Sequence, residues 1–227
     1  MHKVKGYEDK NVALRRVIAG KQVLHLGAVG ETTSNLEAKV SGIENGVHAS
    51  LTRHASACIG VDYDADAVDA ILKAGTFTNI ICRDIFQLKR DEIELGTIDF
   101  IVAGDVVEHL ANPGLMLDVI GNICDKDTTL IVTVPNSQGL PQFLRYLIGK
   151  QIEGSDHKIS FNVYSLTNLL RDRGWEVTGT SGCYQAASQG LNGSVRFRVG
   201  RFVLRRFPSL AGTLIVVARR LTSPNAA

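Results

Sequence analysis

Short apolar runs rich in β-branched residues recur along the chain and alternate with segments of helical character. The first five runs are Gln22–Leu26, Ala57–Val61, Asn79–Cys82, Ile98–Ala103 and Thr129–Val134. Strands that are apolar on both faces must be covered on both, and strands separated by helices are joined in parallel. The pattern therefore predicts a doubly wound α/β fold with helices on both faces of one sheet.

Helix-capping residues mark where several of the intervening helices begin. An opening helix is expected over Glu8–Ala19, and the predicted caps are Asp64 (before a helix over Ala65–Ala74), Asn112 (before Pro113) and Ser165. These helices separate the strands, as parallel connections require.

The last third of the chain completes the sheet. Two final strands are expected at Trp175–Thr178 and Gly212–Ala218, which brings the total to seven. The connection between them is unusually long, and we interpret residues 181–211 as an insertion. Too few residues remain for a second core, so the prediction is a single domain over residues 1–227.

Composition excludes several classes of protein. The net charge of +2 is too small to indicate a nucleic-acid partner. The four cysteines form no Cys-x-x-Cys pair, and no His or carboxylate pair has ligand spacing on one helix, so neither a disulfide framework nor a metal is expected. Met1–Lys10 is polar and shows no secretory signal. These features predict a cytoplasmic protein.

Glycines and acids follow the first four strands. Gly27 and Gly30 follow the first strand, Asp62 ends the second, Asp84 follows the third, and Gly104-Asp105 follow the fourth. The carboxyl ends of parallel strands meet at one edge of the sheet, where such folds bind ligands. A glycine turn lets the backbone approach a ligand, and an acid can accept hydrogen bonds from ribose hydroxyls. Together they predict a nucleoside site.

The spacing of these residues differs from that of a dinucleotide site. Asp62 lies 32 residues after Gly30 (62 − 30), whereas roughly 20 is usual. The segment between them must hold a helix and an extra loop, expected over Ser41–Ser50. The full Gly-x-Gly-x-x-Gly is absent as well, so the pyrophosphate of NAD has an incomplete cradle.

Several segments together resemble the class I S-adenosylmethionine-dependent methyltransferases. They are Val23-Leu-His-Leu-Gly-Ala-Val-Gly30, Gly60-Val-Asp-Tyr-Asp64, Asp84-Ile-Phe86 and Phe100-Ile-Val-Ala-Gly-Asp-Val-Val-Glu-His-Leu110. The likeness is nearest to the small-molecule and glycan branch, including enzymes encoded beside surface-polysaccharide genes. It implies a Rossmann-like seven-stranded sheet, mostly parallel with an antiparallel last strand. The chain departs from the family pattern at His25, Val29 and Glu31, which replace an acid and two glycines.

The resemblance also implies a role for each residue at the strand ends. Gly27, Ala28 and Gly30 would line the methionine end of S-adenosylmethionine. Asp62 would hold the ribose hydroxyls, with Tyr63 on the adenine face, and Asp84 and Ile85 would meet the adenine edge. Gly104 and Asp105 would pass close to the sulfonium. S-adenosylmethionine is thus the expected cofactor, and S-adenosylhomocysteine the expected product.

A hydroxyl acceptor calls for a general base, and histidine titrates near neutral pH. His109 follows the fourth strand by one helical turn, and His157 lies before the Ser165 helix. These two are the base candidates, with Asp105 and Glu108 in reserve. A structural role for His109 is the alternative, because Glu-His-Leu recurs in the family in enzymes with different acceptors.

The insertion contains a basic and apolar stretch, Val195–Phe207. Its apolar face can pack on the sheet, lie on an anionic membrane together with Phe143–Ile148, or leave its arginines to bind a phosphate-bearing acceptor such as a lipid-linked or nucleotide-linked sugar. Packing on the sheet is the favoured interpretation. A membrane contact would place the protein at the inner face of the membrane.

The sequence leaves three functions to be compared. The first is methyl transfer from S-adenosylmethionine to oxygen or nitrogen of a small molecule or glycan. The second is a non-catalytic module that binds the same cofactor, and the third is a nicotinamide-dependent oxidoreductase. The strand-end residues favour the first, since fold alone does not choose among them. The oligomeric state is not indicated.

Overall fold

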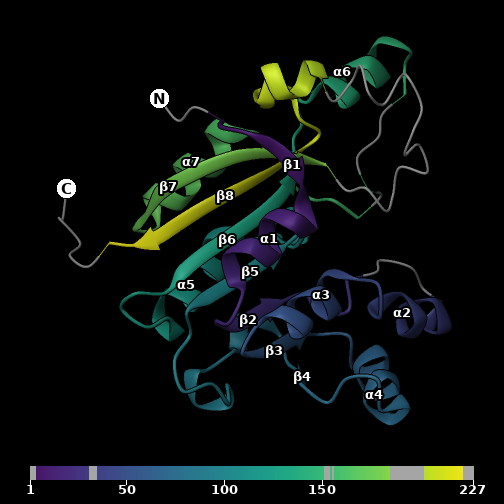
Figure 1. The fold of residues 1–227 in the computed structure, drawn as a ribbon, viewed down its shortest axis with the longest axis vertical. Coiled ribbons are helices and arrows are strands. Elements are labelled where there is room, and N and C mark those ends of the chain that lie inside the picture. The colour runs from purple at the N-terminus through teal and green to yellow at the C-terminus, as the bar shows by residue number, and fades with distance from the viewer. Residues whose placement is uncertain (1–3, 31–34, 151–153, 155, 185–201, 222–227) are drawn as a thin grey trace.

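The computed structural model describes residues 4–30, 35–150, 154, 156–184 and 202–221. One eight-stranded sheet runs through it (Figure 1). Its strands are β1 (Tyr7–Asp9), β2 (Gln22–Leu26), β3 (Ala57–Asp62), β4 (Ile80–Cys82), β5 (Phe100–Gly104), β6 (Thr129–Pro135), β7 (Trp175–Tyr184) and β8 (Thr213–Arg220). Their order across the sheet is β1-β7-β8-β6-β5-β2-β3-β4.

The predicted doubly wound, Rossmann-like sheet is confirmed. Strand β8 is antiparallel to both β6 and β7, and the other pairs are parallel. The sheet has eight strands instead of seven because Tyr7–Asp9 forms β1, which pairs with β7. The expected helix over Glu8–Ala19 is therefore shorter and starts at Lys10, where the Asp9 side chain caps it.

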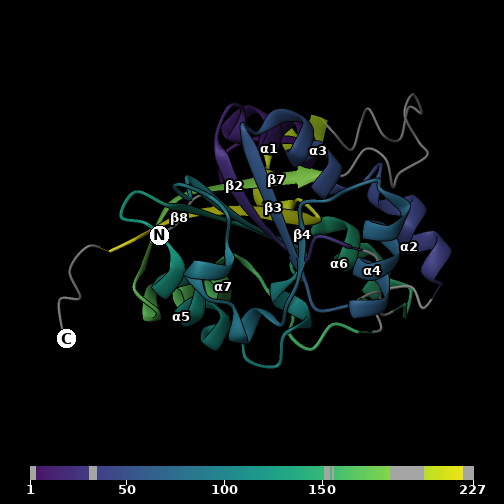
Figure 2. The same cartoon turned by 90° about the horizontal axis from the view of Figure 1, so that it is seen from below.

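Helices cover both faces of the sheet (Figure 2). They are α1 (Lys10–Ile18), α2 (Leu36–Ile43), α3 (Val47–His54), α4 (Ala65–Ala74), α5 (Pro113–Ile123), α6 (Leu140–Leu147) and α7 (Val163–Asp172), with short 3-10 helices η1 (Ile85–Gln87), η2 (Arg90–Glu92), η3 (Val107–His109) and η5 (Pro208–Leu210). Helices α1 and α3 pack on one face, whereas α5 and α7 pack on the other.

Successive side chains of β2 alternate between the two core clusters on opposite faces of the sheet. Leu24 and Leu26 join the cluster under α5 and α7, whereas Val23 joins the cluster under α1 and α3. Successive side chains of a strand point to opposite faces. His25 therefore points to the α1 and α3 side.

Two caps are confirmed and one is corrected. The Asp64 side chain accepts a hydrogen bond from the backbone N–H of Ala67, and that of Asn112 accepts one from Leu115. Ser165 is not the cap of α7. Asn162 caps that helix by accepting from Ser165 N, and Ser165 Oγ, at the third helical position, accepts from Asn162 N, which makes a capping box.

Two expected loops are also corrected. The extra loop over Ser41–Ser50 is largely helical, because α2 continues to Ile43 and α3 begins at Val47. Strand β7 continues to Tyr184, so residues 181–184 belong to the sheet instead of the insertion. Residues 185–201, with most of the Val195–Phe207 stretch, lie outside the described residues, and residues 202–206 are helical.

Candidate functional site

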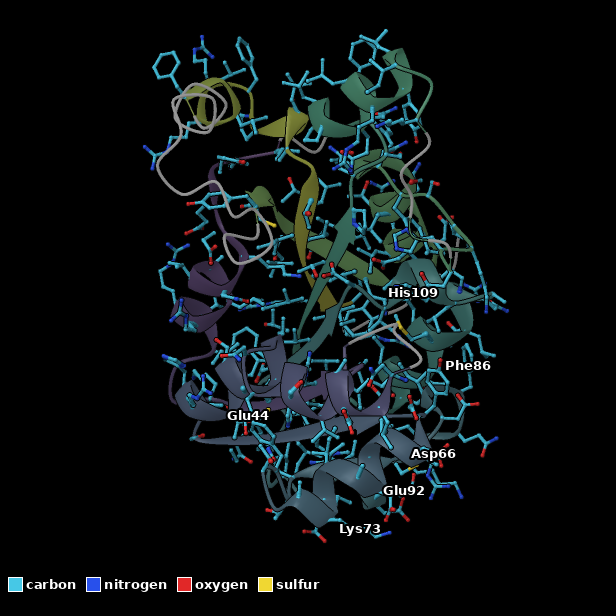
Figure 3. The ribbon with its side chains drawn as sticks, turned by 90° about the vertical axis from the view of Figure 1, so that its right-hand side faces the viewer. Glu44, Asp66, Lys73, Phe86, Glu92 and His109 are labelled. Atoms are coloured by element: carbon cyan, nitrogen blue, oxygen red, sulfur yellow. The ribbon has the colours of Figure 1, made fainter. Side chains whose placement is uncertain are left out.

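A cavity of about 590 Å³ opens at the carboxyl ends of β2, β3, β4 and β5. The register of the parallel pairs sets Leu26 opposite both Val61 and Ala103, so these strands end at one level. Its size lies within the range that binds small molecules and cofactors. Figure 3 shows Phe86 and His109, which both line the cavity, on the same side of the molecule.

The glycine turn after β2 forms one wall of the cavity. Gly27 has φ +72° and Gly30 has φ +73°, both in the left-handed region. A Cβ on Gly27 would lie 2.5 Å from Val106 Cγ2, so a side chain there would strain the backbone and displace Val106. Both glycines line the cavity. Ala28, predicted beside them, is buried in the core under α2 and α4 and is not among the lining residues.

Asp62 joins the turn to the end of β3. Its Oδ2 accepts a hydrogen bond from Val29 N at 2.9 Å, and its Oδ1 accepts one from Asp64 N at 3.1 Å. Burial raises the pKa of Asp62, and these backbone donors oppose the rise. The carboxylate is thus fixed in the cavity wall, and its remaining lone pairs can accept from hydroxyls of a ligand.

The other predicted nucleoside contacts also line the cavity. Tyr63, 81% exposed, lies at the rim. Asp84 caps η1 by accepting a hydrogen bond from Phe86 N at 2.9 Å, which places Ile85 and Phe86 in the wall. Phe86 was not predicted, although the Asp84-Ile-Phe86 segment had been singled out. An apolar slot next to a carboxylate suits the face and edge of a purine base.

Ion pairs neutralise two cations around the cavity. Lys39 pairs with Asp64, and Arg83 pairs with Glu92. The Lys39 ammonium lowers the pKa of Asp64, and Asp64 in turn raises the pKa of Lys39. Among the described lining residues, Lys158 is the cation that remains without a carboxylate partner. A pyrophosphate would find little positive charge here.

Gly104 and Asp105 lead from β5 into the cavity, as predicted. Asp105 has φ +54°, uncommon for a residue with a side chain. Its carboxylate pairs with the buried Lys10 at the start of α1 and accepts a hydrogen bond from Thr133 Oγ1 at 2.9 Å. The charge of Asp105 is therefore compensated from two elements, which makes it better suited to hold the strand end in shape than to take a proton.

Two buried histidines, His25 on β2 and His48 on α3, form a pair on the α1 and α3 side of the sheet. His25 Nδ1 lies 3.3 Å from His48 Nδ1, and the two rings stack. Burial lowers the pKa of His48 to about 4 and holds that of His25 well below its usual value. A side chain on Gly60 would meet His48 at 2.7 Å, so the pair packs closely under β3.

The two predicted base candidates lie together in space. The rings of His109 and His157 are 4.8 Å apart at 85°, and His109 Nδ1 lies 2.9 Å from Asp156 Oδ2. Glu108 is 2% exposed beside them. Burial, with the charge of Asp105 as a second cause, raises the pKa of Glu108 to about 8. Asp156 and Lys10 were not predicted, since only the fold shows their position.

A family model described as a methyltransferase domain matches residues 27–180. No curated protein matches. A S-adenosylmethionine-dependent methyltransferase from Archaeoglobus fulgidus is similar in structure, with a TM-score of 0.57 and 16% identity over 92% of each chain.

Two further solved structures share the fold. A methyltransferase-like protein from Bacillus halodurans C-125 gives a TM-score of 0.57 and 12% identity over 94% of this chain and 99% of that one. The N-methyltransferase NodS from Bradyrhizobium japonicum WM9, solved with S-adenosylhomocysteine, gives 0.54 and 12% over 93% and 85%. A small RNA methyltransferase is also similar. The shared fold therefore does not identify the acceptor.

Proposed function

The chain belongs to the methyltransferase-domain family, and we propose that it transfers a methyl group from S-adenosylmethionine to a hydroxyl oxygen of a small-molecule or glycan acceptor. The observation that carries this proposal is the cavity in which Gly27 and Gly30, Asp62, and Asp84 come together from three strand ends. Bound there, the sulfonium supplies an electrophilic methyl group that needs little further activation.

The residues of the cavity fit S-adenosylmethionine better than a dinucleotide. Asp62 would hold the ribose hydroxyls, because its fixed carboxylate faces the cavity. Asp84, Ile85 and Phe86 would take the adenine. Lys39 and Arg83 are paired with Asp64 and Glu92, so they offer little to a pyrophosphate. The molecule therefore matches a cofactor whose reactive end is cationic.

The acceptor would enter from the side of Glu108, His109 and His157. Glu108 and His157 line a second cavity of about 210 Å³, which also contains Ser137, Gln142 and Ser160. His109 lines the larger cavity. A hydroxyl group placed between these two cavities would lie near both histidines, and aligning it with the methyl group is the main task of the site. Polar side chains of this kind suit a small hydroxylated acceptor.

Binding measurements separate the three candidate functions. In isothermal titration calorimetry we expect S-adenosylhomocysteine to bind and NAD to give no heat of binding. The reverse result would support an oxidoreductase. A panel of hydroxylated acceptors in a homocysteine-release assay then distinguishes an enzyme from a non-catalytic module. The module would bind S-adenosylhomocysteine but would not produce it from S-adenosylmethionine.

A second proposal concerns the membrane, and the exposed apolar surface of α6 supports it. No residue of this helix is buried. Its exposed apolar side chains are Phe143, Leu144, Tyr146 and Leu147, and exposed Ile148 follows it. The helix at residues 202–206 lies at the same end of the molecule (Figures 1 and 3) and adds exposed Phe202, with Phe207 following it. No helix among the described residues is long and apolar enough to cross a bilayer. A peripheral contact at the inner face of the membrane is the form we propose.

Vesicle co-sedimentation tests this contact. We expect the protein to pellet with vesicles of phosphatidylcholine and phosphatidylglycerol and to stay in the supernatant with phosphatidylcholine alone, because Arg145, Arg205 and Arg206 accompany the apolar residues. The Leu147→Ser/Ile148→Ser variant should no longer pellet, whereas Leu72→Ser, an exposed position on α4, should behave as the wild type. Equal pelleting of all three proteins would contradict the proposal.

A further inference from the structure

Three metal-ligating side chains meet between the two cavities, although they come from separate segments. Glu108 and His109 lie on η3, and His157 lies ahead of α7. One carboxylate oxygen and one nitrogen of each imidazole all lie within 4.8 Å of one another. Ligand atoms around a divalent cation with bonds of about 2.1 Å are at most about 4.2 Å apart. Small side-chain rotations would therefore bring the three groups into contact with one ion.

The carboxyl group of Glu108 is an independent sign that a ligand belongs here. The side chain is buried, and neither of its oxygens has a hydrogen-bond partner among the described residues. A buried polar group without partners is costly, so native structures rarely retain one without a reason. The same side chain lines the second cavity together with His157. Its unpaired oxygens are available to an ion at that position.

The surrounding backbone keeps the two segments together. The carbonyl oxygen of Glu108 accepts hydrogen bonds from Lys158 N at 2.8 Å and Ile159 N at 3.2 Å, so the His157 segment is fastened directly to η3. Asp156 lies 2.9 Å from His109 Nδ1. A carboxylate on one ring nitrogen orients a metal-binding histidine and sets which nitrogen keeps its lone pair. Asp156 stands in that position.

We propose that Glu108, His109 and His157 bind a divalent cation of the zinc, cobalt or manganese type, and that this cation holds the acceptor hydroxyl for methyl transfer. Two imidazoles and one carboxylate suit these ions, whereas calcium and magnesium prefer all-oxygen sites. Three protein ligands leave coordination positions open for an acceptor oxygen. The role of the cation in holding the acceptor hydroxyl rests on the proposed function, whereas the metal site itself does not.

The cation changes what the two histidines do. Coordination would lower the pKa of the acceptor hydroxyl, and its proton would pass to solvent. The oxygen then forms the new O–C bond while the C–S bond breaks, and the electron pair of that bond remains on sulfur, which becomes a neutral thioether. His109 and His157 act as ligands in this scheme, in place of the general-base role predicted from the sequence.

Metal binding can be measured without any acceptor. The untagged protein, stripped with a chelator and dialysed, is titrated with Co²⁺ alone by calorimetry and visible absorption, and with Zn²⁺ in competition. We expect one Co²⁺ per chain and a d–d absorption band. Glu108→Gln and His157→Asn should each weaken Co²⁺ binding at least about 100-fold, and Asp156→Asn about 10- to 100-fold.

Matched controls make the result decisive. His54→Asn removes an exposed histidine at the end of α3 and should bind Co²⁺ as the wild type does. Circular dichroism melting checks that each variant is folded. If Glu108→Gln does not fold, His157→Asn still tests the site, because His157 is only partly buried. The metal site is overturned if the wild type does not bind Co²⁺. It is also overturned if Glu108→Gln and His157→Asn bind Co²⁺ as tightly as the wild type does.

The same samples separate this inference from the proposed function. S-adenosylhomocysteine is titrated into the stripped and the Co²⁺-loaded protein. If it binds and Co²⁺ does not, the metal site is wrong and the methyltransferase proposal stands. If Co²⁺ binds and S-adenosylhomocysteine does not, the site is a metal centre but its role in methyl transfer is refuted.

Discussion

Replacing Asp62 with alanine should weaken the binding of S-adenosylhomocysteine about 10- to 150-fold. The carboxylate is held in the cavity wall by hydrogen bonds from Val29 N and Asp64 N, with lone pairs left for two ribose hydroxyls. A hydrogen bond to a charged group is worth about 1.5–3 kcal/mol, and a factor of ten in affinity is about 1.4 kcal/mol. Isothermal titration calorimetry measures the change directly.

Asp66→Asn is the matched control for this substitution. Asp66 is an exposed acid in the first turn of α4, close in sequence to Asp62 but not among the residues that line the cavity. It should bind S-adenosylhomocysteine with the wild-type affinity. Asp62→Asn, which keeps the shape of the side chain and removes its charge, should fall between alanine and the wild type. An unchanged affinity in Asp62→Ala, with the fold intact by circular dichroism, would show that the ribose lies elsewhere.

Lowering the pH from 7 to 5 should destabilise the folded protein through His48 by about 2 kcal/mol. The folded pKa of His48 is about 4, below the usual value of 6.5, because the ring is buried. The unfolded chain therefore takes up a proton first as the pH falls, and stability is lost from about pH 6.5 down to about pH 4. Burial, with the nearby charges of His48 and Lys10, lowers the pKa of His25 as well, so His25 adds to the loss of stability.

Urea unfolding at pH 7 and pH 5 tests the role of the buried pair. The loss of free energy of unfolding between the two pH values should be about 2 kcal/mol smaller in His48→Gln than in the wild type. His54→Gln removes an exposed histidine from the other end of the same helix α3 and should keep the wild-type loss. If His48→Gln lost as much free energy as the wild type, His48 would be protonated in the folded protein.

The sheet was predictable because its signals are local. Gln22–Leu26 is a mainly apolar run followed by Gly27, and β2 has the same bounds. Ala65–Ala74 was bounded by its cap and by Gly75, and α4 has these bounds too. The resemblance to class I methyltransferases rested on segments at strand ends, so Gly27, Gly30, Asp62 and Asp84 were placed in one cavity before the fold was known.

Features that depend on tertiary contact were missed. Strand β1 has the sequence Tyr-Glu-Asp, which carries no strand signal, and it forms because β7 offers an open edge. His25 and His48 are 23 residues apart in the chain, and their pairing depends on how α3 packs under β2. Neither contact leaves a periodic pattern that a sequence could show.

The same reason explains the expectation that no metal binds. Glu108 and His109 are adjacent, which is not a ligand spacing for one helix, and His157 lies 48 residues after His109 (157 − 109). Hydrogen bonds from Lys158 and Ile159 to the Glu108 carbonyl, with the contact between Asp156 and His109, bring the third ligand to the first two. The proposed metal site is therefore a consequence of the fold.

A crystal structure with S-adenosylhomocysteine tests the central claim most directly. The account predicts the ribose hydroxyls within hydrogen-bond distance of the Asp62 carboxylate, the adenine against Ile85 and Phe86, and the sulfur beside Gly104, facing His109. A nucleoside bound outside the cavity that Gly27 and Asp62 share would contradict the account.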